Sequence, residues 1–438
     1  MSDWFARRAR LAAQLPAGAV AVLATAPERR RNGDSDYPYR HDSSFYYLCG
    51  FPEPEAVLVI VAGQRPRSLL FCREKNAERE IWDGFRYGPE AAQTAFGVDE
   101  AYPIDDLDVH LAELLADAPA LYLPLARDAA LDARARGWLD SVRAQARKGV
   151  QAPAVLGDLT PLVEEMRLIK DAGELATMEQ AGRISAQAHA RAMRAVRPGM
   201  PEYALEAELL YEFRRHGAQA PAYPSIVAGG ANACVLHYVA NNALLRDGDL
   251  VLIDAGCELD GYASDITRTF PVNGRFSPAQ RDLYELVLAA QAAAIATIAP
   301  GRRVAEVHEA ALRVLTQGML DLGLITHLVS LEQALEQRLY LPFYMHGTSH
   351  WLGMDVHDCG NYKDVHHSER PSRLLETGMV LTVEPGIYVR AAEGVPREFW
   401  NTGIRIEDDA AVTAHGARLL SAGAPKTVRE IEDLMQHD

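Results

Sequence analysis

The sequence lacks a long hydrophobic run, which limits its class before any motif is considered. Its longest candidate, residues 286–299, is rich in alanine, interrupted by a glutamine and shorter than the ~20 apolar residues that span a bilayer. We therefore expect neither a membrane span nor a membrane partner. At the N-terminus, basic residues within 7–10 and the stretch GAVAVLATA superficially resemble a secretory signal. Gln14, Pro16 and Gly18 interrupt that signal and instead favour a helix, a turn and a first strand.

Cysteine is scarce, and its pattern argues against a disulfide framework. The five residues form no C-x-x-C pair, their number is odd, and a chain of 438 residues can build a core without disulfides. We therefore expect reduced thiols and a cytoplasmic location. The cysteines are Cys49, Cys72, Cys234, Cys257 and Cys359.

Positive charge is also in deficit. Lys and Arg total 44 against 60 Asp and Glu, and the resulting net charge of −16 disfavours nucleic acid or an anionic membrane as a partner. Hydrophobic residues make up 48% and charged residues 24%, as in ordinary globular proteins. Since 438 residues exceed what one hydrophobic core usually serves, we expect two domains.

The first part of the chain, to about residue 165, is typical of an α/β domain. Helix-like segments rich in alanine and leucine separate the strand-like runs AVAVLA, AVLVIVAG, SLLFC and ALYLPLA. Residues 31–55 are polar, aromatic and rich in proline, which predicts a long loop. A boundary near VEEMRLIKDAGEL divides the chain into predicted domains of residues 1–168 and 169–438.

The second part contains the same order of elements twice. Asp171 and Glu174 form a predicted capping box for a helix over residues 172–196. That helix stops at Pro198-Gly199, and a second helix and several strands follow. The order helix, Pro-Gly, helix, strands then recurs around Pro300-Gly301, 102 residues later. The repeat predicts two similar halves that face each other across a cleft.

Two aspartates lie in apolar surroundings in the first of these halves. Asp254 ends the buried-looking run LVLID, and Asp265 begins the β-prone run DITRTF. The connection between them contains Gly256 and Gly261, so a hairpin can bring both carboxylates together. Paired buried carboxylates repel each other unless a cation neutralises them. For either aspartate alone, a cap or turn role is the simpler interpretation.

The second half supplies further candidate ligands at the ends of apolar segments. The segment FYMHGTSHWLGMDVHD carries His346, His350 and His357, VLTVEPG carries Glu384, and GIRIEDD carries Glu407 with Arg405 on the same predicted strand face. A single histidine in such a segment is usually a satisfied core residue, and a single glutamate can face solvent. Several apolar segments that each end in a potential ligand favour a shared site.

The combined set has one imidazole and four carboxylates. Such an oxygen-rich set suits Mn, Co or Zn more than Cu. With some carboxylates bridging, five ligands suffice for two divalent ions, and two ions ~3.5–4 Å apart support hydrolysis. The candidate metal ligands are Asp254, Asp265, His350, Glu384 and Glu407.

In order and context these residues resemble the five metal ligands of the pita-bread metallopeptidases, and most closely those of bacterial aminopeptidase P. The segments that carry the resemblance are LVLIDAGCELDGYASDITRTFPVNG, MHGTSHWLGMDVHD, GMVLTVEPGIY and GIRIEDD, with RNGDSDYPYRHDSSFYYLCGF in the first domain. The resemblance implies an α/β (α+β) fold, with a creatinase-like N-terminal domain before a pita-bread catalytic domain of pseudo-two-fold halves. It also implies two divalent ions, usually Mn²⁺.

The resemblance further implies how the ions are held. Asp254 would chelate one ion, Asp265 and Glu407 would bridge both, and His350 and Glu384 would complete the ligand set. A hydroxide that bridges the metals would attack the carbonyl before the proline nitrogen. Glu384 would act as general base and then as general acid.

Roles outside the metal ligands also come from the resemblance. His237, in CVLHYVAN, matches a histidine that binds substrate and stabilises the tetrahedral intermediate, and His357 matches a second catalytic histidine. His346 and His357 would line the proline side, and Arg405 would hold an aspartate ligand. Trp82 matches an aromatic residue near the substrate cleft, with a core or loop aromatic as an equal alternative. The implied substrate-binding residues are His237, His346, His357, Arg405 and Trp82.

The implied activity is that of an Xaa-Pro aminopeptidase acting on peptides with proline at position 2. The implied assembly is a homodimer or homotetramer built partly through the N-terminal domain. Prolidase, which cleaves only dipeptides, uses the same chemistry and remains an alternative. A noncatalytic binding module is a second alternative, although such proteins lose metal ligands and all five are intact here.

Overall fold

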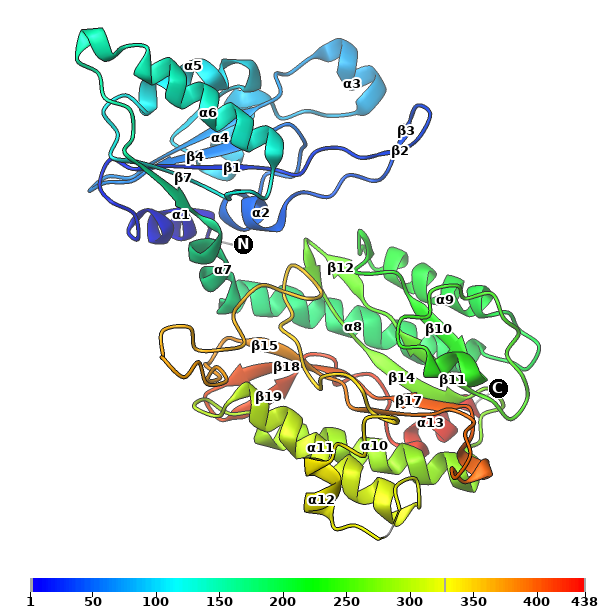
Figure 1. The fold of residues 1–438 in the computed structure, drawn as a ribbon. Helices are drawn as coiled ribbons and strands as arrows, with labels where there is room; N and C mark the ends of the chain where they lie inside the picture. The colour runs from blue at the N-terminus through cyan, green and yellow to red at the C-terminus, as the bar shows by residue number, and fades with distance from the viewer. Residues whose placement is uncertain (1–2, 327, 437–438) are drawn as a thin grey trace. The chain divides into compact units, whose positions relative to one another are not determined.

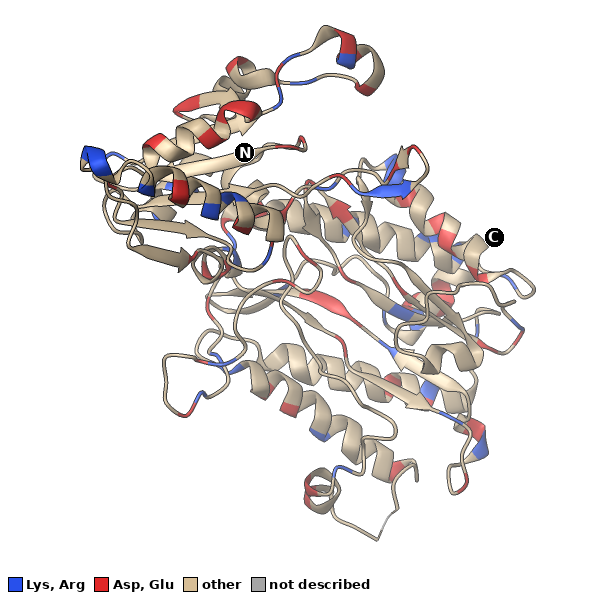
Figure 2. Ribbon diagram, turned by 45° about the horizontal axis from the view of Figure 1, so that its top comes forward, with Lys and Arg blue, Asp and Glu red and all other residues tan. Residues whose placement is uncertain are grey.

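The computed structural model describes residues 3–326 and 328–436. These residues form two compact units, one up to Arg167 and one from Leu168 onward. None of the described helices is both long enough and apolar enough to cross a bilayer. Lys and Arg are interspersed with Asp and Glu along both units (Figure 2).

The first unit is built on a six-stranded mixed sheet in the order β6-β5-β4-β1-β7-β8. The four strand-like runs predicted from the sequence all form strands of this sheet. β1, β4 and β5 are antiparallel neighbours, and the other pairings are parallel. The strands are β1 (Val20–Ala24), β4 (Val57–Val61), β5 (Arg67–Cys72), β6 (Glu100–Pro103), β7 (Ala120–Leu123) and β8 (Val155–Asp158).

Helices cover both faces of this sheet. Leucines of α5 (Leu107–Leu114) and the apolar side of α6 (Ala129–Arg143) pack on one face, whereas α1 (Trp4–Ala12) and α2 (Ser43–Cys49) lie against the other (Figure 1). The expected helix and first strand at the N-terminus are thus α1 and β1. The unit also contains α3 (Ala77–Asp83), α4 (Gly88–Phe96) and all of α7 (Thr160–Leu168) except its last residue.

The prediction of one long loop over residues 31–55 is wrong for much of that stretch. A hairpin forms from β2 (Arg30–Asn32) and β3 (Ser35–Asp36), and α2 follows. Asp42 caps α2 by accepting the Phe45 N–H at 2.8 Å. Aromatic residues of the predicted loop instead bury one side of this helix, and Phe45 is 0% exposed.

The second unit has two helix pairs with strands between them, in the pseudo-two-fold arrangement predicted from the repeat (Figure 1). α8 (Ala172–Ala195) packs on α9 (Glu202–Arg215), and α10 (Pro278–Thr297) packs on α11 (Val304–Asp321). The predicted capping box at Asp171 and Glu174 is present, so the start of α8 is confirmed. The unit also contains two shorter helices, α12 (Leu331–Glu336) and α13 (Val428–Met435).

The strands of the second unit form small antiparallel sheets. Alternation along β11 sends Val251 and Ile253 into the main core with the helices, while Leu252 joins a smaller apolar cluster on the opposite face. The strands are β9 (Ala220–Pro221), β10 (Ile226–Gly229), β11 (Leu250–Asp254), β12 (Cys257–Leu259), β13 (Tyr262–Ala263), β14 (Thr267–Pro271), β15 (Val380–Val383), β16 (Gly386–Val389), β17 (Thr402–Arg405), β18 (Asp408–Thr413) and β19 (Gly416–Leu419).

Candidate active site

The two aspartates of the first half lie together, as the hairpin hypothesis predicted. β11 pairs antiparallel with β14, and Asp254 is opposite Thr267, two residues after Asp265. The connection is longer than a turn, because it contains β12 and β13. Gly256 allows the backbone of this connection to lie close to the backbone of Ser264, since an added Cβ would be 1.7 Å from the Ser264 carbonyl oxygen.

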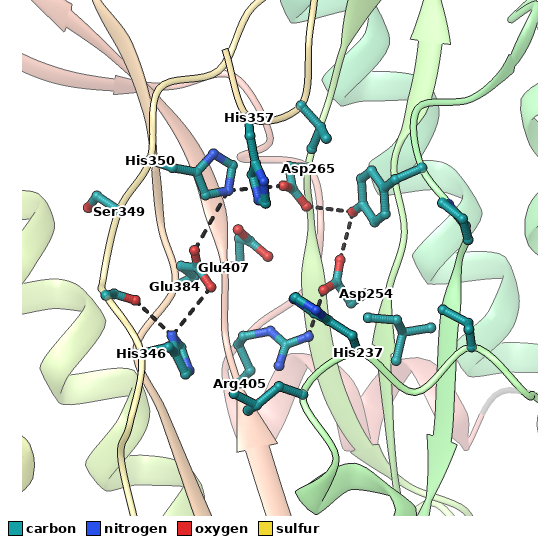
Figure 3. Close-up of a pocket in the computed structure, with 17 residues that line it drawn as sticks. His237, Asp254, Asp265, His346, Ser349, His350, His357, Glu384, Arg405 and Glu407 are labelled. Atoms are coloured by element: carbon teal, nitrogen blue, oxygen red, sulfur yellow. Dashed lines mark hydrogen bonds and ion pairs between the residues drawn. The ribbon is translucent and has the colours of Figure 1, made fainter. Parts of the chain in front are cut away.

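A tyrosine that the sequence analysis did not single out joins the two carboxylates. The Tyr223 hydroxyl lies 2.7 Å from Asp254 Oδ1 and 2.5 Å from Asp265 Oδ1 (Figure 3). Burial and the neighbouring carboxylates raise the pKa of Tyr223 well above its usual value, so the phenol stays protonated. Tyr223 lies in an ordinary pre-strand segment, APAYPSI, and no local pattern distinguished it.

The second half brings His350 and Glu384 to the same place. His350 Nε2 is 3.4 Å from Asp265 Oδ2 and 3.7 Å from Glu384 Oε1. Glu384 directly follows the buried strand β15, as predicted. One potential ligand atom each from Asp265, His350 and Glu407 lies within 4.8 Å of the other two.

The backbone fixes which nitrogen of His350 faces the carboxylates. His350 Nδ1 is 3.0 Å from the carbonyl oxygen of Trp351, which can only accept a hydrogen bond. When Nδ1 carries the proton, the lone pair of Nε2 points at Asp265 and Glu384. This is the arrangement in which a histidine binds a metal through Nε2.

Arg405 and Glu407 both reach the pocket, but they do not share a strand. β17 ends at Arg405 and β18 begins at Asp408, so the prediction of one strand face is wrong. The chain changes sheets here, since β17 pairs with β16 and β18 with β15. Thr267 reconnects the two side chains: its Oγ1 donates to Glu407 Oε2 at 2.6 Å and accepts from Arg405 Nε at 3.1 Å.

A cavity of about 510 Å³ contains nine of the ten predicted site residues. The exception is Trp82, which lies on α3 in the first unit and is 80% exposed. The apolar part of the lining includes Ile226, Leu236, Val239 and Val356. The predicted residues in the lining are His237, Asp254, Asp265, His346, His350, His357, Glu384, Arg405 and Glu407.

The charged groups of the protein neutralise only part of the buried carboxylate charge: despite burial, the neighbouring His350 lowers the pKa of Asp265. Burial and carboxylate neighbours raise the pKa of Glu407 well above its usual value, and burial raises that of Glu384 to about 7. Burial also raises the pKa of Asp254, despite the opposing effect of Arg405. A divalent cation would relieve this repulsion, and carboxylates with one imidazole are donors that Mn, Co or Zn accept. The donor set therefore fits a metal site.

The three remaining histidines have different surroundings. His346 Nδ1 lies 2.7 Å from the Gly347 carbonyl oxygen and Nε2 lies 2.8 Å from the Tyr388 hydroxyl, while burial lowers its pKa to about 4. The ring of His357 meets that of His350 edge-on, with centroids 4.4 Å apart. His237 is exposed, lies on a turn and lines the pocket.

Comparison with known proteins gives the family. Residues 176–414 match the model of metallopeptidase family M24, and residues 4–122 match the aminopeptidase P N-terminal domain. The chain is 44% identical to the Xaa-Pro aminopeptidase of Escherichia coli over 431 residues, which is 98% of this chain and 96% of the relative. The Xaa-Pro aminopeptidase of Haemophilus influenzae gives the same identity and coverage.

Solved structures give the same result. The aminopeptidase PepP of Pseudomonas aeruginosa matches with a TM-score of 0.96 and 49% identity, over 99% of this chain and 97% of that one. Zinc-substituted E. coli aminopeptidase P, in complex with product, matches with a TM-score of 0.95 and 44% identity over the same shares. The resemblance predicted from the motifs is confirmed. The chain belongs to metallopeptidase family M24 and carries the N-terminal domain of aminopeptidase P.

Proposed function

We propose that the chain is a metal-dependent Xaa-Pro aminopeptidase, which hydrolyses the bond between the first residue of a peptide and a following proline. The observation that carries the proposal is the convergence of carboxylates and His350 in one pocket, in a chain that matches Xaa-Pro aminopeptidases over nearly its whole length. The similarity to relatives named Xaa-Pro aminopeptidase favours an aminopeptidase over a prolidase. The intact donor set disfavours a noncatalytic binding module.

We further propose that the site holds two divalent cations, with Mn²⁺ as the principal metal and Co²⁺ or Zn²⁺ as alternatives. The residues that would hold the ions are Asp254, Asp265, His350, Glu384 and Glu407. Ions bound there would activate the attacking water and polarise the scissile carbonyl. Arg405 would keep Asp254 oriented through their 2.6 Å ion pair.

The protein's own residues would move the protons and bind the peptide. Glu384 would take a proton from the attacking water and deliver one to the departing proline nitrogen. His237 would bind the substrate and donate to the oxygen that gains charge in the tetrahedral intermediate. His357 would assist catalysis, and with His346 it would line the proline side.

The proposed specificity has a physical basis. An Xaa-Pro bond is a tertiary amide without an N–H, and the proline ring fixes φ. Peptidases that bind an extended backbone lose a hydrogen bond at that position. Apolar residues such as Ile226 and Val356 in the pocket lining can instead contact the ring.

We propose a cytoplasmic enzyme, because Cys49, Cys72, Cys234 and Cys257 are buried free thiols. We also propose domains of residues 1–168 and 169–438, which the two compact units support. A homodimer or homotetramer built partly through the first domain is proposed from the family resemblance. In such an assembly the exposed Trp82 could contribute to a neighbouring subunit's substrate cleft.

The test is Mn²⁺-dependent release of the first residue from a peptide that begins Xaa-Pro-Pro. Wild type would be compared with Asp265→Ala and with Asp282→Ala, a matched control on the exposed side of α10. We expect cleavage by wild type and control only with metal, and none by Asp265→Ala. Cleavage restricted to an Xaa-Pro dipeptide would indicate a prolidase. Metal binding without cleavage of either substrate would indicate a binding module.

A further inference from the structure

Glu202, the first residue of α9, is buried without a cation among its described hydrogen-bond partners. Its side chain is 0% exposed. Oε1 accepts from the Gly229 N–H at 2.8 Å and from Asn232 Nδ2 at 3.1 Å. Oε2 accepts from the Tyr238 hydroxyl at 2.8 Å and from the Ala243 N–H at 2.9 Å. Four donors match the acceptor capacity of an ionised carboxylate, and the N-terminus of a helix favours its charge.

All four donors belong to one segment, residues 229–243, and that segment carries His237. Two of the donors precede His237 in the chain and two follow it. Within the segment, the short 3-10 helix Gly230–Cys234 leads directly into the turn that presents the imidazole. One carboxylate therefore binds both ends of the loop.

The side chain of His237 makes few interactions that could fix its position. Its side chain is exposed, and its ring makes no hydrogen bond with any other part of the chain that the structure describes. Figure 3 shows the ring reaching over the pocket from the side of Asp254 and Arg405. Its position is therefore set by the backbone of its loop, and the buried anchors of that backbone determine where the imidazole lies.

We propose that Glu202 is a positioning residue for His237. By binding Gly229, Asn232, Tyr238 and Ala243 at once, its carboxylate holds the loop in the shape that directs the imidazole toward the substrate. Hydrogen bonds to an ionised acceptor are stronger than neutral ones, so four of them restrain a loop whose surface is exposed. The inference rests on the proposed function and on the part that His237 has in it.

The first test is Glu202→Gln, which keeps the size of the side chain but turns one acceptor into a donor. In either orientation the new NH₂ group faces two existing donors, so two anchors are lost. We expect kcat/KM for the Xaa-Pro-Pro peptide to fall ~10- to 100-fold, as misplacement of a catalytic group does. Mn²⁺ titration should be unchanged, because the loop carries none of the proposed ligands. The matched control is Glu208→Gln on the same helix, which should retain wild-type kcat/KM.

A double-mutant cycle separates positioning from general stabilisation. In a His237→Ala background, Glu202→Gln should change kcat/KM by less than ~2-fold, because the group it positions is gone. In a His357→Ala background, it should cause its full loss. Equal losses in the two backgrounds would overturn the proposal, as would a Glu202→Gln enzyme with wild-type kcat/KM.

Tyr238→Phe provides an independent variant that removes one anchor and no buried charge. It should give a smaller loss of kcat/KM that also disappears in the His237→Ala background, and it decides the question if Glu202→Gln does not fold. A loss that persists in that background would contradict the positioning role. Wild-type cleavage in the same assay is tested separately: its absence would overturn the proposed function and this inference together.

Discussion

Arg405 binds Asp254 directly, with Nη2 2.6 Å from Oδ2 and both side chains nearly buried. The same guanidinium donates to the Tyr388 hydroxyl at 2.9 Å and to Thr267 Oγ1 at 3.1 Å. One cation thus touches the proposed ligand Asp254 and, through Thr267, the proposed ligand Glu407. It links side chains that come from β11, β14, β16 and β17.

Arg405→Met should therefore weaken metal binding rather than only substrate binding. Without the guanidinium, Asp254 loses its orienting partner, and partners of this kind typically change metal affinity or activity ~10- to 100-fold. Isothermal titration with Mn²⁺ measures the affinity directly. Arg418→Met, at an exposed ion pair with Glu179, is the control and should bind Mn²⁺ normally. Normal Mn²⁺ affinity in Arg405→Met would contradict the role given to this arginine.

Gly256→Ala should disrupt the pair of aspartates without removing either carboxylate. The added methyl group would lie 1.7 Å from the Ser264 carbonyl oxygen, so the backbone between Asp254 and Asp265 must move. We expect a loss of several kcal/mol in the free energy of unfolding, or no folded protein, as for overpacked buried sites. The measurement is urea unfolding followed by circular dichroism.

Gly137→Ala is the matched control for that substitution. Gly137 lies within α6, and an added Cβ meets no atom within 4 Å. Since alanine favours a helix by ~1 kcal/mol relative to glycine, this variant should be slightly more stable than wild type. If the two alanine variants behaved alike, the close crossing at Gly256 would not be the cause.

Lys170→Met should be strongly destabilising because it removes one partner of a buried ion pair. Lys170 Nζ lies 2.9 Å from Asp358 Oδ2, and both side chains are 1% exposed. Removal of one partner of such a pair typically costs ~3–5 kcal/mol in the free energy of unfolding. The double variant Lys170→Met/Asp358→Leu should recover most of this loss, because apolar pairs can replace buried ion pairs. A double variant as unstable as the single one would show that packing, and not charge, dominates.

His189 should make the protein less stable in mild acid. Burial lowers its pKa to about 4 from an ordinary value of 6.5. Below pH ~6.5 His189 binds a proton in the unfolded chain but stays neutral in the folded chain. The free energy of unfolding therefore decreases from pH ~6.5 toward pH 4, by up to ~1.4 kcal/mol per pH unit. His189→Gln should remove this contribution, visible as a flatter dependence of unfolding free energy on pH. The exposed His415→Gln should match wild type, and equal slopes for all three proteins would exclude His189 as the source.

Local sequence features accounted for much of the fold. The capping box at Asp171 and Glu174, the strand that ends at Asp254 and the repeated order around the two Pro-Gly pairs all appear in the structure. Each depends on residues within a few positions of one another. Residues 31–55 were predicted less well, because their composition resembles that of a loop although Asp42 caps a buried helix there.

The motifs also placed nine of the ten predicted site residues in one pocket, since each ends an apolar segment or lies in a recognisable loop. They could not reveal Tyr223 or Thr267, whose roles depend on contacts across the fold. Thr267 meets Glu407 across 140 residues of sequence. The end of β17 at Arg405 and the start of β18 after Glu407 could not be predicted for the same reason. These bounds are set by pairing of β17 with β16 and of β18 with β15.

By itself, the sequence predicted the class of site: one imidazole and four carboxylates, each next to an apolar segment, in two repeated halves. Apolar periodicity and capping chemistry act locally, so these features can be read from neighbouring residues. Only the tertiary structure decided which oxygens meet, which nitrogen of His350 faces them and which buried carboxylate, Glu202, anchors the loop of His237. Those outcomes depend on hydrogen bonds between distant segments, and distance in the folded chain cannot be read from distance along it.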